Sequence, residues 1–207
     1  MSATTGTRAP YIGDISAKIA EAYAEDPTII AHTHSGGGHN ATGQAETIPR
    51  ATAGASITLA SGTMLFAYLT PSAAMSATGL WVVAGSTAAD TITIGKLGLY
   101  SVAANGNLTL VQGSTNDTAL LGTIGGPFNK AITAAALVAG SRYAIGVLTV
   151  GTTAGSVRGA SGVTGSTHPG GSWPRMAAAL ASQTDLPSSV ASGSLTATGN
   201  TIWAGVS

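Results

Sequence analysis

The chain has 207 residues, with eight Lys or Arg balanced by eight Asp or Glu, and it contains no cysteine. Only 8% of the residues are charged, whereas an ordinary soluble domain is roughly a quarter charged. Zero net charge and the lack of a basic cluster exclude the pattern of a nucleic-acid-binding protein, and no stretch is apolar enough to predict membrane insertion. With so few charges to keep copies apart, the composition favours a component of a permanent assembly over a freely diffusing enzyme.

The first fifty residues carry eight of the sixteen charges and begin with a predicted helix. Good helix formers fill Asp14–Glu25, Asp14 is a suitable N-cap, and Pro27 ends the helix. Isoleucines recur along one face at spacings of three and four: Ile12, Ile15 and Ile19. Isoleucine at both core positions of a coiled coil favours three or more strands. Residues 1–28 are therefore interpreted as an attachment or trimerisation region, with a single helix packed on its own domain as the alternative.

Residues 29–48 form a predicted linker in which three of the four histidines gather: His32, His34 and His39. In an extended chain His32 and His34 point to the same side, because side chains repeat every two residues. Three such chains around a threefold axis would bring six imidazoles together, with His39 as a further candidate ligand. Six nitrogens suit an octahedral transition-metal ion such as iron or nickel.

Two other interpretations of this histidine segment stay open. Within a single chain the histidines would offer at most three ligands and an open position, as in a catalytic zinc site. The segment is also consistent with a solvated Gly/His linker that holds no metal.

Residues 49–207 are predicted to be mainly β, in a jelly-roll-like antiparallel β-sandwich. The dipeptide Asn105-Gly106 between the β-prone runs Ile94–Val102 and Leu108–Val111 is a strong hairpin pattern. In all, strands are expected over Ser56–Leu59, Thr63–Leu69, Gly79–Val83, Thr91–Ser101, Leu108–Gln112, Arg142–Val150, Gly193–Ala197 and Thr201–Val206. About eight strands with Gly, Ser and Asn turns are typical of a sandwich or jelly roll. Ala131–Ala139 is compatible with a helical turn, and Met176–Ser182 with either helix or strand.

The sequence lacks the usual patterns of catalytic residues, which predicts that the chain is not an enzyme. Residues 49–207 contain no Glu and three Asp, which argues against the paired carboxylates of a glycosidase. The segment Gly159–Gly162 lacks the strand and helix context of a nucleophile elbow. His168 precedes Pro169 in an expected loop, and no acidic partner is close in sequence.

The three tryptophans allow a carbohydrate-binding surface, because exposed aromatic rings provide large contact areas with a polar edge. Trp173 lies in a Gly/Pro-rich segment and is the candidate ligand contact, with packing over the end of the sandwich as the alternative. Trp81 and Trp203 lie within predicted strands and are interpreted as core residues.

Two parts of the sequence resemble bacteriophage virion proteins. The runs Ile48–Thr52, Leu59–Met64 and Ala139–Val147 resemble β-rich domains of actinobacteriophage virion proteins, often described as minor tail proteins. His32-Thr33-His34 is similar to the His-x-His motif of trimeric phage fibres and spikes, in which such pairs hold an axial metal.

The resemblance implies a homotrimeric virion surface protein that is assembled in the host cytoplasm and contacts other virion proteins. Its N-terminal region would attach to the particle, and its β domain would face outward, with a host cell-surface glycan as a candidate partner. The resemblance assigns no catalytic residue. It leaves capsid decoration, as a head fibre, as an alternative to the tail, and a carbohydrate-binding module is the further alternative.

Overall fold

The computed structural model describes residues 44–162 and 176–207. The predicted helix over Asp14–Glu25 and the three clustered histidines lie outside these residues. The described residues are mainly β, as the sequence predicts. Nowhere in these two ranges is there a helix that is long and apolar enough to cross a bilayer.

The strands follow one another with short connections. They are β1 (Ala45–Glu46), β2 (Ala55–Thr58), β3 (Met64–Leu69), β4 (Met75–Val83), β5 (Asp90–Val102), β6 (Leu108–Gly113), β7 (Pro127–Leu137), β8 (Tyr143–Thr153), β9 (Ser156–Ala160), β10 (Ala177–Leu180), β11 (Ser189–Val190), β12 (Thr196–Ala197), β13 (Thr201–Ile202) and β14 (Ala204–Val206). Two single turns of 3-10 helix, η1 (Arg50–Thr52) and η2 (Ser192–Ser194), complete the described structure.

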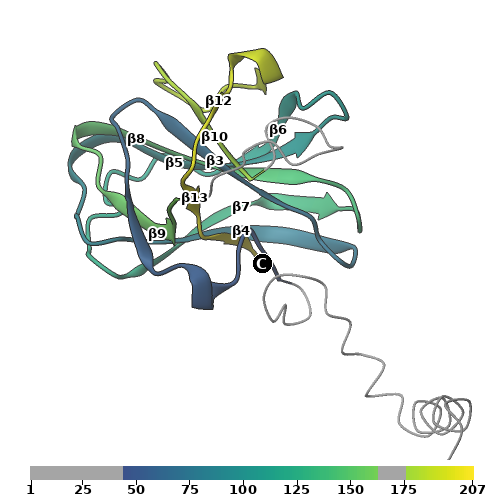
Figure 1. The fold of residues 1–207 in the computed structure, drawn as a ribbon, viewed down its shortest axis with the longest axis horizontal. Helices are drawn as coiled ribbons and strands as arrows, with labels where there is room; N and C mark the ends of the chain where they lie inside the picture. Colours follow the sequence, from purple (N-terminus) through teal and green to yellow (C-terminus); the bar gives the residue numbers. More distant parts are fainter. Residues whose placement is uncertain (1–43, 163–175) are drawn as a thin grey trace, which may run out of the picture. The chain divides into compact units, whose positions relative to one another are not determined.

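The strand order is that of a jelly roll, which confirms the predicted fold class. One sheet has the order β1-β14-β4-β7, and the other has the order β11-β6-β5-β8-β3-β10-β12. Because β3 and β4 lie in different sheets, as do β6 and β7, the chain crosses repeatedly between the two layers (Figure 1). A third sheet, β13-β9-β2, adds a further small layer.

Two local expectations differ from the structure, and the structure decides between two alternatives at a third place. The helical turn considered over Ala131–Ala139 is wrong, because β7 continues to Leu137 and pairs with β4. Burial of Ala135 and Leu137 in the core outweighs the helix propensity of the alanines. Met176–Ser182 contains the strand β10, which is one of its two alternatives. The continuous strand expected over Gly193–Ala197 is wrong: its first two residues belong to η2, and only its last two form β12.

The sandwich also begins earlier than residue 49. Ala45 and Glu46, which the sequence assigns to the linker, form β1 and pair with Val206 and Gly205 of β14. Ala45 is buried in the core. Glu46 is therefore a residue of the sandwich, whereas the sandwich expected over residues 49–207 contains no Glu.

The inner core lies between the two large sheets and follows from strand alternation. In β4, Leu80 and Val82 are fully buried, whereas Trp81 and Val83 between and after them are only half-buried. Both large sheets contribute aliphatic side chains to one continuous cluster that includes Leu97, Leu99, Ile145, Val147, Ala204 and Val206. Small and aliphatic residues thus fill the space between the layers.

An outer core covers the other face of the seven-stranded sheet. Phe66 of β3 and Tyr100 of β5 pack edge to face with ring centroids 5.2 Å apart. The Tyr100 hydroxyl donates to the Met64 sulfur at 3.9 Å, and burial raises the pKa of Tyr100. Residues that follow β10 in the chain join this cluster: Leu186, Val190 and Leu195. Both faces of the seven-stranded sheet are consequently apolar.

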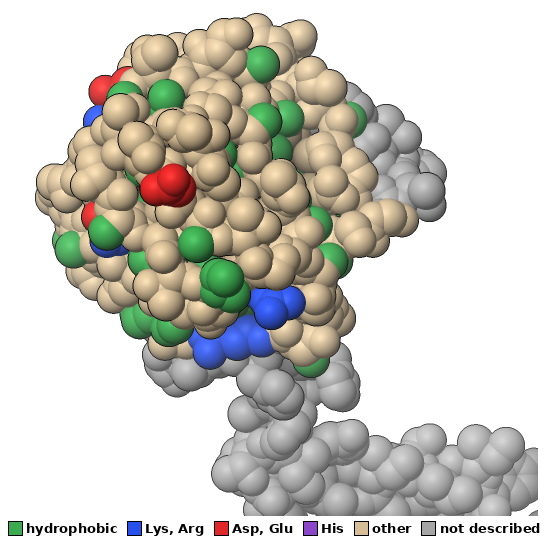
Figure 2. Space-filling view, turned by 90° about the vertical axis from the view of Figure 1, so that its left-hand side faces the viewer, with side chains coloured by type: hydrophobic (Ala, Val, Ile, Leu, Met, Phe, Trp, Pro, Cys, Tyr) green, Lys and Arg blue, Asp and Glu red, His purple; other side chains and the backbone are tan. Residues whose placement is uncertain are grey.

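Charged side chains are sparse on the face of the molecule seen in Figure 2. Most of the charged residues in the described part of the chain form ion pairs. Lys96 of β5 binds Asp185 at 2.6 Å, which ties the C-terminal segment to the outer face of the sheet. Lys130 of β7 pairs with Asp117, and this hydrogen bond holds the pKa of Asp117 below its usual value. These pairs fix connecting segments to strands.

The packing over Gly146 generates a stability prediction. A Cβ at this position would overlap the Met64 methyl group and lie 2.9 Å from the Phe66 ring. We expect Gly146→Ala to lower the free energy of unfolding by about 1–3 kcal/mol, because the outer core has no room for the added carbon. Urea denaturation would measure it. Gly54→Ala is the control, since nothing lies within 4 Å of its Cβ; equal midpoints for the two variants would contradict this packing.

Candidate functional site

Four neighbouring strands place one row of residues on the outer face of the four-stranded sheet. Glu46 of β1 pairs with Gly205 of β14, Gly205 pairs with Trp81 of β4, and Trp81 pairs with Asn129 of β7. The strand register therefore places a carboxylate, a glycine without a side chain, an indole and an amide next to one another. This row runs across the whole sheet.

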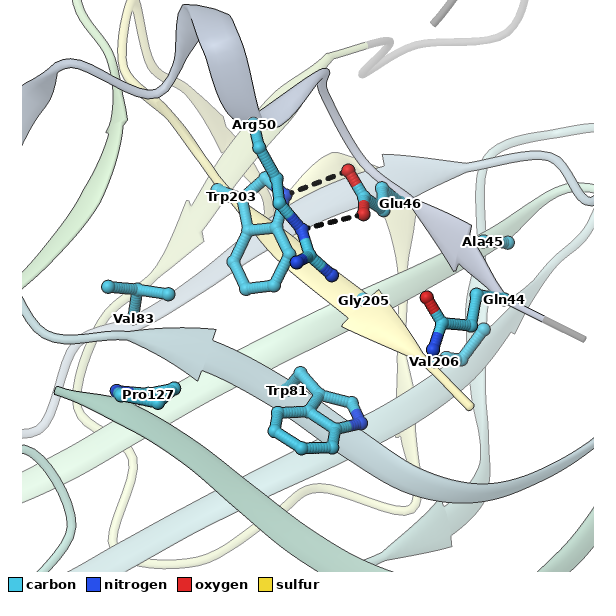
Figure 3. Close-up of a pocket in the computed structure, with 10 residues that line it drawn as sticks. All are labelled: Gln44, Ala45, Glu46, Arg50, Trp81, Val83, Pro127, Trp203, Gly205 and Val206. Carbon is cyan, nitrogen blue, oxygen red and sulfur yellow. Dashed lines mark hydrogen bonds and ion pairs between the residues drawn. The ribbon is translucent and has the colours of Figure 1, made fainter. Parts of the chain in front are cut away.

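A pocket of about 390 Å³ lies over this row (Figure 3). Its lining residues come from β1, η1, β4, β7 and β14 and the segments beside them: Gln44, Ala45, Glu46, Arg50, Trp81, Val83, Pro127, Trp203, Gly205 and Val206. Gly205 lies between Glu46 and Trp81 in the strand register and carries no side chain, so the space above it is open. A glycine in the middle of the row is thus what makes the surface concave.

Glu46 is the most constrained polar residue of the pocket. Its side chain is only 9% exposed. One carboxylate oxygen accepts a hydrogen bond from the Arg50 Nε at 2.9 Å, and the other accepts one from the Trp203 indole nitrogen at 3.0 Å. Both oxygens therefore have fixed positions at one side of the pocket.

Arg50 covers the ring of Trp203. Its guanidinium carbon lies 4.9 Å from the ring centroid, and Trp203 is 3% exposed. A guanidinium over an aromatic face is an attractive cation–π arrangement. The Arg50 side chain is itself 67% exposed, so the nitrogens beyond Nε face the pocket opening and solvent.

Trp81 forms the opposite side of the pocket from Arg50 and Trp203 (Figure 3). Its indole nitrogen donates to the Ser207 Oγ at 2.9 Å, which fixes the ring on the sheet. Gly79 permits this arrangement, because a Cβ there would lie 3.0 Å from the same oxygen. The half-buried indole thus offers apolar surface in a defined orientation.

The pocket combines an aromatic surface with hydrogen-bonding groups and no net charge. Arg50 and Glu46 neutralise each other, and Gln44 adds an exposed amide at the rim. Mostly apolar concave sites with a few fixed polar groups are typical of small-molecule binding sites. The arrangement is suited to binding a small polar ligand.

The residues singled out in the sequence do not form this site. The trimer candidates Ile12, Ile15 and Ile19, the metal candidates His32, His34 and His39, and the ligand-contact candidate Trp173 all lie outside the described residues. Within residues 44–162 and 176–207, no group of three or more His, Cys, Asp or Glu is placed to hold a metal. The predicted metal site and trimer contacts stay predictions.

The structure changes the interpretation of one tryptophan. Trp203 is buried, as expected, but Trp81 is half-buried and lines the pocket. The sequence contains a sign of this placement. Side chains alternate between the two faces of a strand, so inward-facing Leu80 and Val82 place Trp81 on the outer face. The spacing of Glu46 and Arg50 four residues apart also permits an ion pair, although only the fold brings them to Trp203.

A scan of protein-family models and a search of curated proteins found no match to this chain.

The contacts of Glu46 generate a second stability prediction. We expect Glu46→Ala to lower the free energy of unfolding by about 1–3 kcal/mol, because the buried indole N–H of Trp203 would lose its acceptor. Glu46→Gln keeps a side-chain acceptor and should lose less. Asp90→Ala is the control, since Asp90 is an exposed carboxylate. Chemical denaturation measures the free energy of unfolding of each variant. Equal decreases for Glu46→Ala and Asp90→Ala would contradict the role of Glu46.

Proposed function

We propose that this chain is a non-enzymatic structural protein of a bacteriophage virion, a trimeric surface appendage of the minor tail or fibre type. The proposal starts from the resemblance of residues 48–207 to virion β domains and of His32-Thr33-His34 to a fibre motif. The observation that carries it in the structure is a jelly-roll sandwich whose described surface has few charges, most of them in ion pairs. Such a surface has little like-charge repulsion to oppose close packing of many copies.

The pocket on the four-stranded sheet supports a role in attachment to a surface. It is built from fixed aromatic and polar side chains on the outer face of the sandwich. A binding site of this kind suits a β domain that faces outward from a particle. Contact with the host cell surface is accordingly the role we assign to the sandwich, with attachment to other virion proteins assigned to residues 1–28.

The location on the particle is tested by copy number. We expect purified virions to contain the chain at a few copies each, as for a tail appendage, when measured by quantitative mass spectrometry against the major capsid protein. Tens to hundreds of copies would instead place it on the head as a decoration protein. Absence from purified virions would contradict the proposed function in either form.

The oligomeric state and the histidine segment are tested together. We expect the purified full chain to be a trimer by mass photometry and to contain iron or nickel by elemental analysis. His32→Ala should remove half of the proposed ligands and release the metal, while the sandwich stays folded by circular dichroism. His168→Ala is the control, because this histidine lies outside the cluster. A monomer without metal would refute the threefold metal site.

A further inference from the structure

We propose that the pocket over Gly205 binds a neutral sugar ring of a glycan, with Trp81 as the apolar platform. This inference rests on the proposed surface role and gives it a ligand class. It also replaces Trp173 as the tryptophan expected to contact a glycan. Three features of the pocket point to this ligand class: the space over Gly205, the orientation of Trp81 and the charge balance between Glu46 and Arg50.

The space over Gly205 is intrinsic to the strand pairing. A Cβ at Gly205 would lie 3.4 Å from the Ala45 carbonyl oxygen and 3.8 Å from the nearest atom of Trp203, which are ordinary or slightly tight contacts. Packing beneath the strand therefore does not require glycine at this position. What the glycine does is leave the gap between Glu46 and Trp81 open.

Trp81 has the properties of a stacking platform. Its N–H is already bonded to Ser207, so the ring is held in place and its remaining contact surface is apolar. A sugar ring carries C–H groups on its faces, and these pack against an indole while the hydroxyl groups point to polar partners. The opposite side of the pocket supplies such partners.

The polar groups of the pocket match hydroxyl groups. The Glu46 oxygens each accept one hydrogen bond here, and a carboxylate oxygen has capacity for a second. The exposed end of Arg50 donates, and the Gln44 amide both donates and accepts. A hydroxyl group can use either kind of partner.

The balanced charges of Glu46 and Arg50 favour a neutral sugar over a charged small ligand. An anion at Arg50 would meet the Glu46 carboxylate, and a cation at Glu46 would meet the Arg50 guanidinium, because the two are 2.9 Å apart. A wholly apolar ligand would bury these polar groups without new partners. A volume of about 390 Å³ is at the lower end of the roughly 300–1,000 Å³ usual for ligand sites, so a short or terminal saccharide fits best.

The test uses the purified full chain labelled with 5-fluorotryptophan. The probes are glucose, galactose, mannose and their neutral trisaccharides. Glucuronate, glucosamine and a polyproline peptide represent the other ligand classes: an anionic sugar, a cationic sugar and a peptide. We expect at least one neutral saccharide to shift the fluorine resonances of Trp81 and Trp203 and to leave that of Trp173 in place. Trp81→Phe assigns the Trp81 resonance.

Variants separate the pocket from the rest of the surface. Trp81→Ala should weaken saccharide binding about tenfold or more by calorimetry, and Trp81→Phe should retain part of it. Gly205→Val should abolish binding by filling the gap, with no polar group removed. Gly193→Val is the matched control, because nothing lies within 4 Å of its Cβ and it should bind as the native chain does. Circular dichroism and thermal unfolding check that each variant is folded.

Several results would overturn the inference. One is that no neutral saccharide binds, and another is that glucuronate, glucosamine or polyproline binds more tightly than the neutral saccharides. The others are that only the fluorine resonance of Trp173 shifts, or that folded Gly205→Val binds a saccharide as tightly as the native chain. Failure here is distinguishable from failure of the proposed function. A chain present on virions that binds no saccharide removes only this inference, and a saccharide-binding chain missing from virions removes only the virion role.

Discussion

Burial of side chains on both faces of the seven-stranded sheet is the constraint on which the rest of the structure depends. Its inner face packs against the four-stranded sheet, and its outer face carries the cluster around Phe66 and Tyr100. Apolar packing covers the middle of its central strands on both faces, and Lys96 of β5 is paired there with Asp185. Among the described residues the four-stranded sheet is covered on one side only, so its outer face is where aromatic and charged side chains can meet a ligand.

The pocket is a consequence of register as much as of residue type. Glu46, Gly205 and Trp81 come from segments far apart in the chain, and a shift of one residue in any of these strands would turn its side chain into the core. The hydrogen bonds from Trp203 to Glu46 and from Trp81 to Ser207 then fix the side chains that the register has brought together. Strand pairing thus determines which residues line the pocket, and side-chain hydrogen bonds fix their orientation.

The sequence predicts the sandwich well because alternation and turns are local properties. Leu80 to Val83 alternate as a half-buried strand does, and Asn105-Gly106 lies at the β5–β6 hairpin. The site was not predicted, because Glu46 belongs to a two-residue strand with no pattern of its own. Its partners Trp203 and Gly205 are more than 150 residues away in the chain. The helical turn expected at the alanines of β7 was wrong for a similar reason, because this segment forms a strand through pairing with β4, which is distant in the chain.

The shortness of β1 has a consequence for dynamics. This strand is joined to the sandwich through two residue pairs with β14 and through hydrogen bonds of Thr47 to Ala204 and Ile202. Its detachment therefore requires much less free energy than unfolding of the layers, and amide hydrogens there exchange through local opening. Because Glu46 leaves the pocket when β1 detaches, any ligand held by Glu46 must slow exchange in this strand. Occupancy of the pocket is thus coupled to the lifetime of the weakest pairing in the sheet.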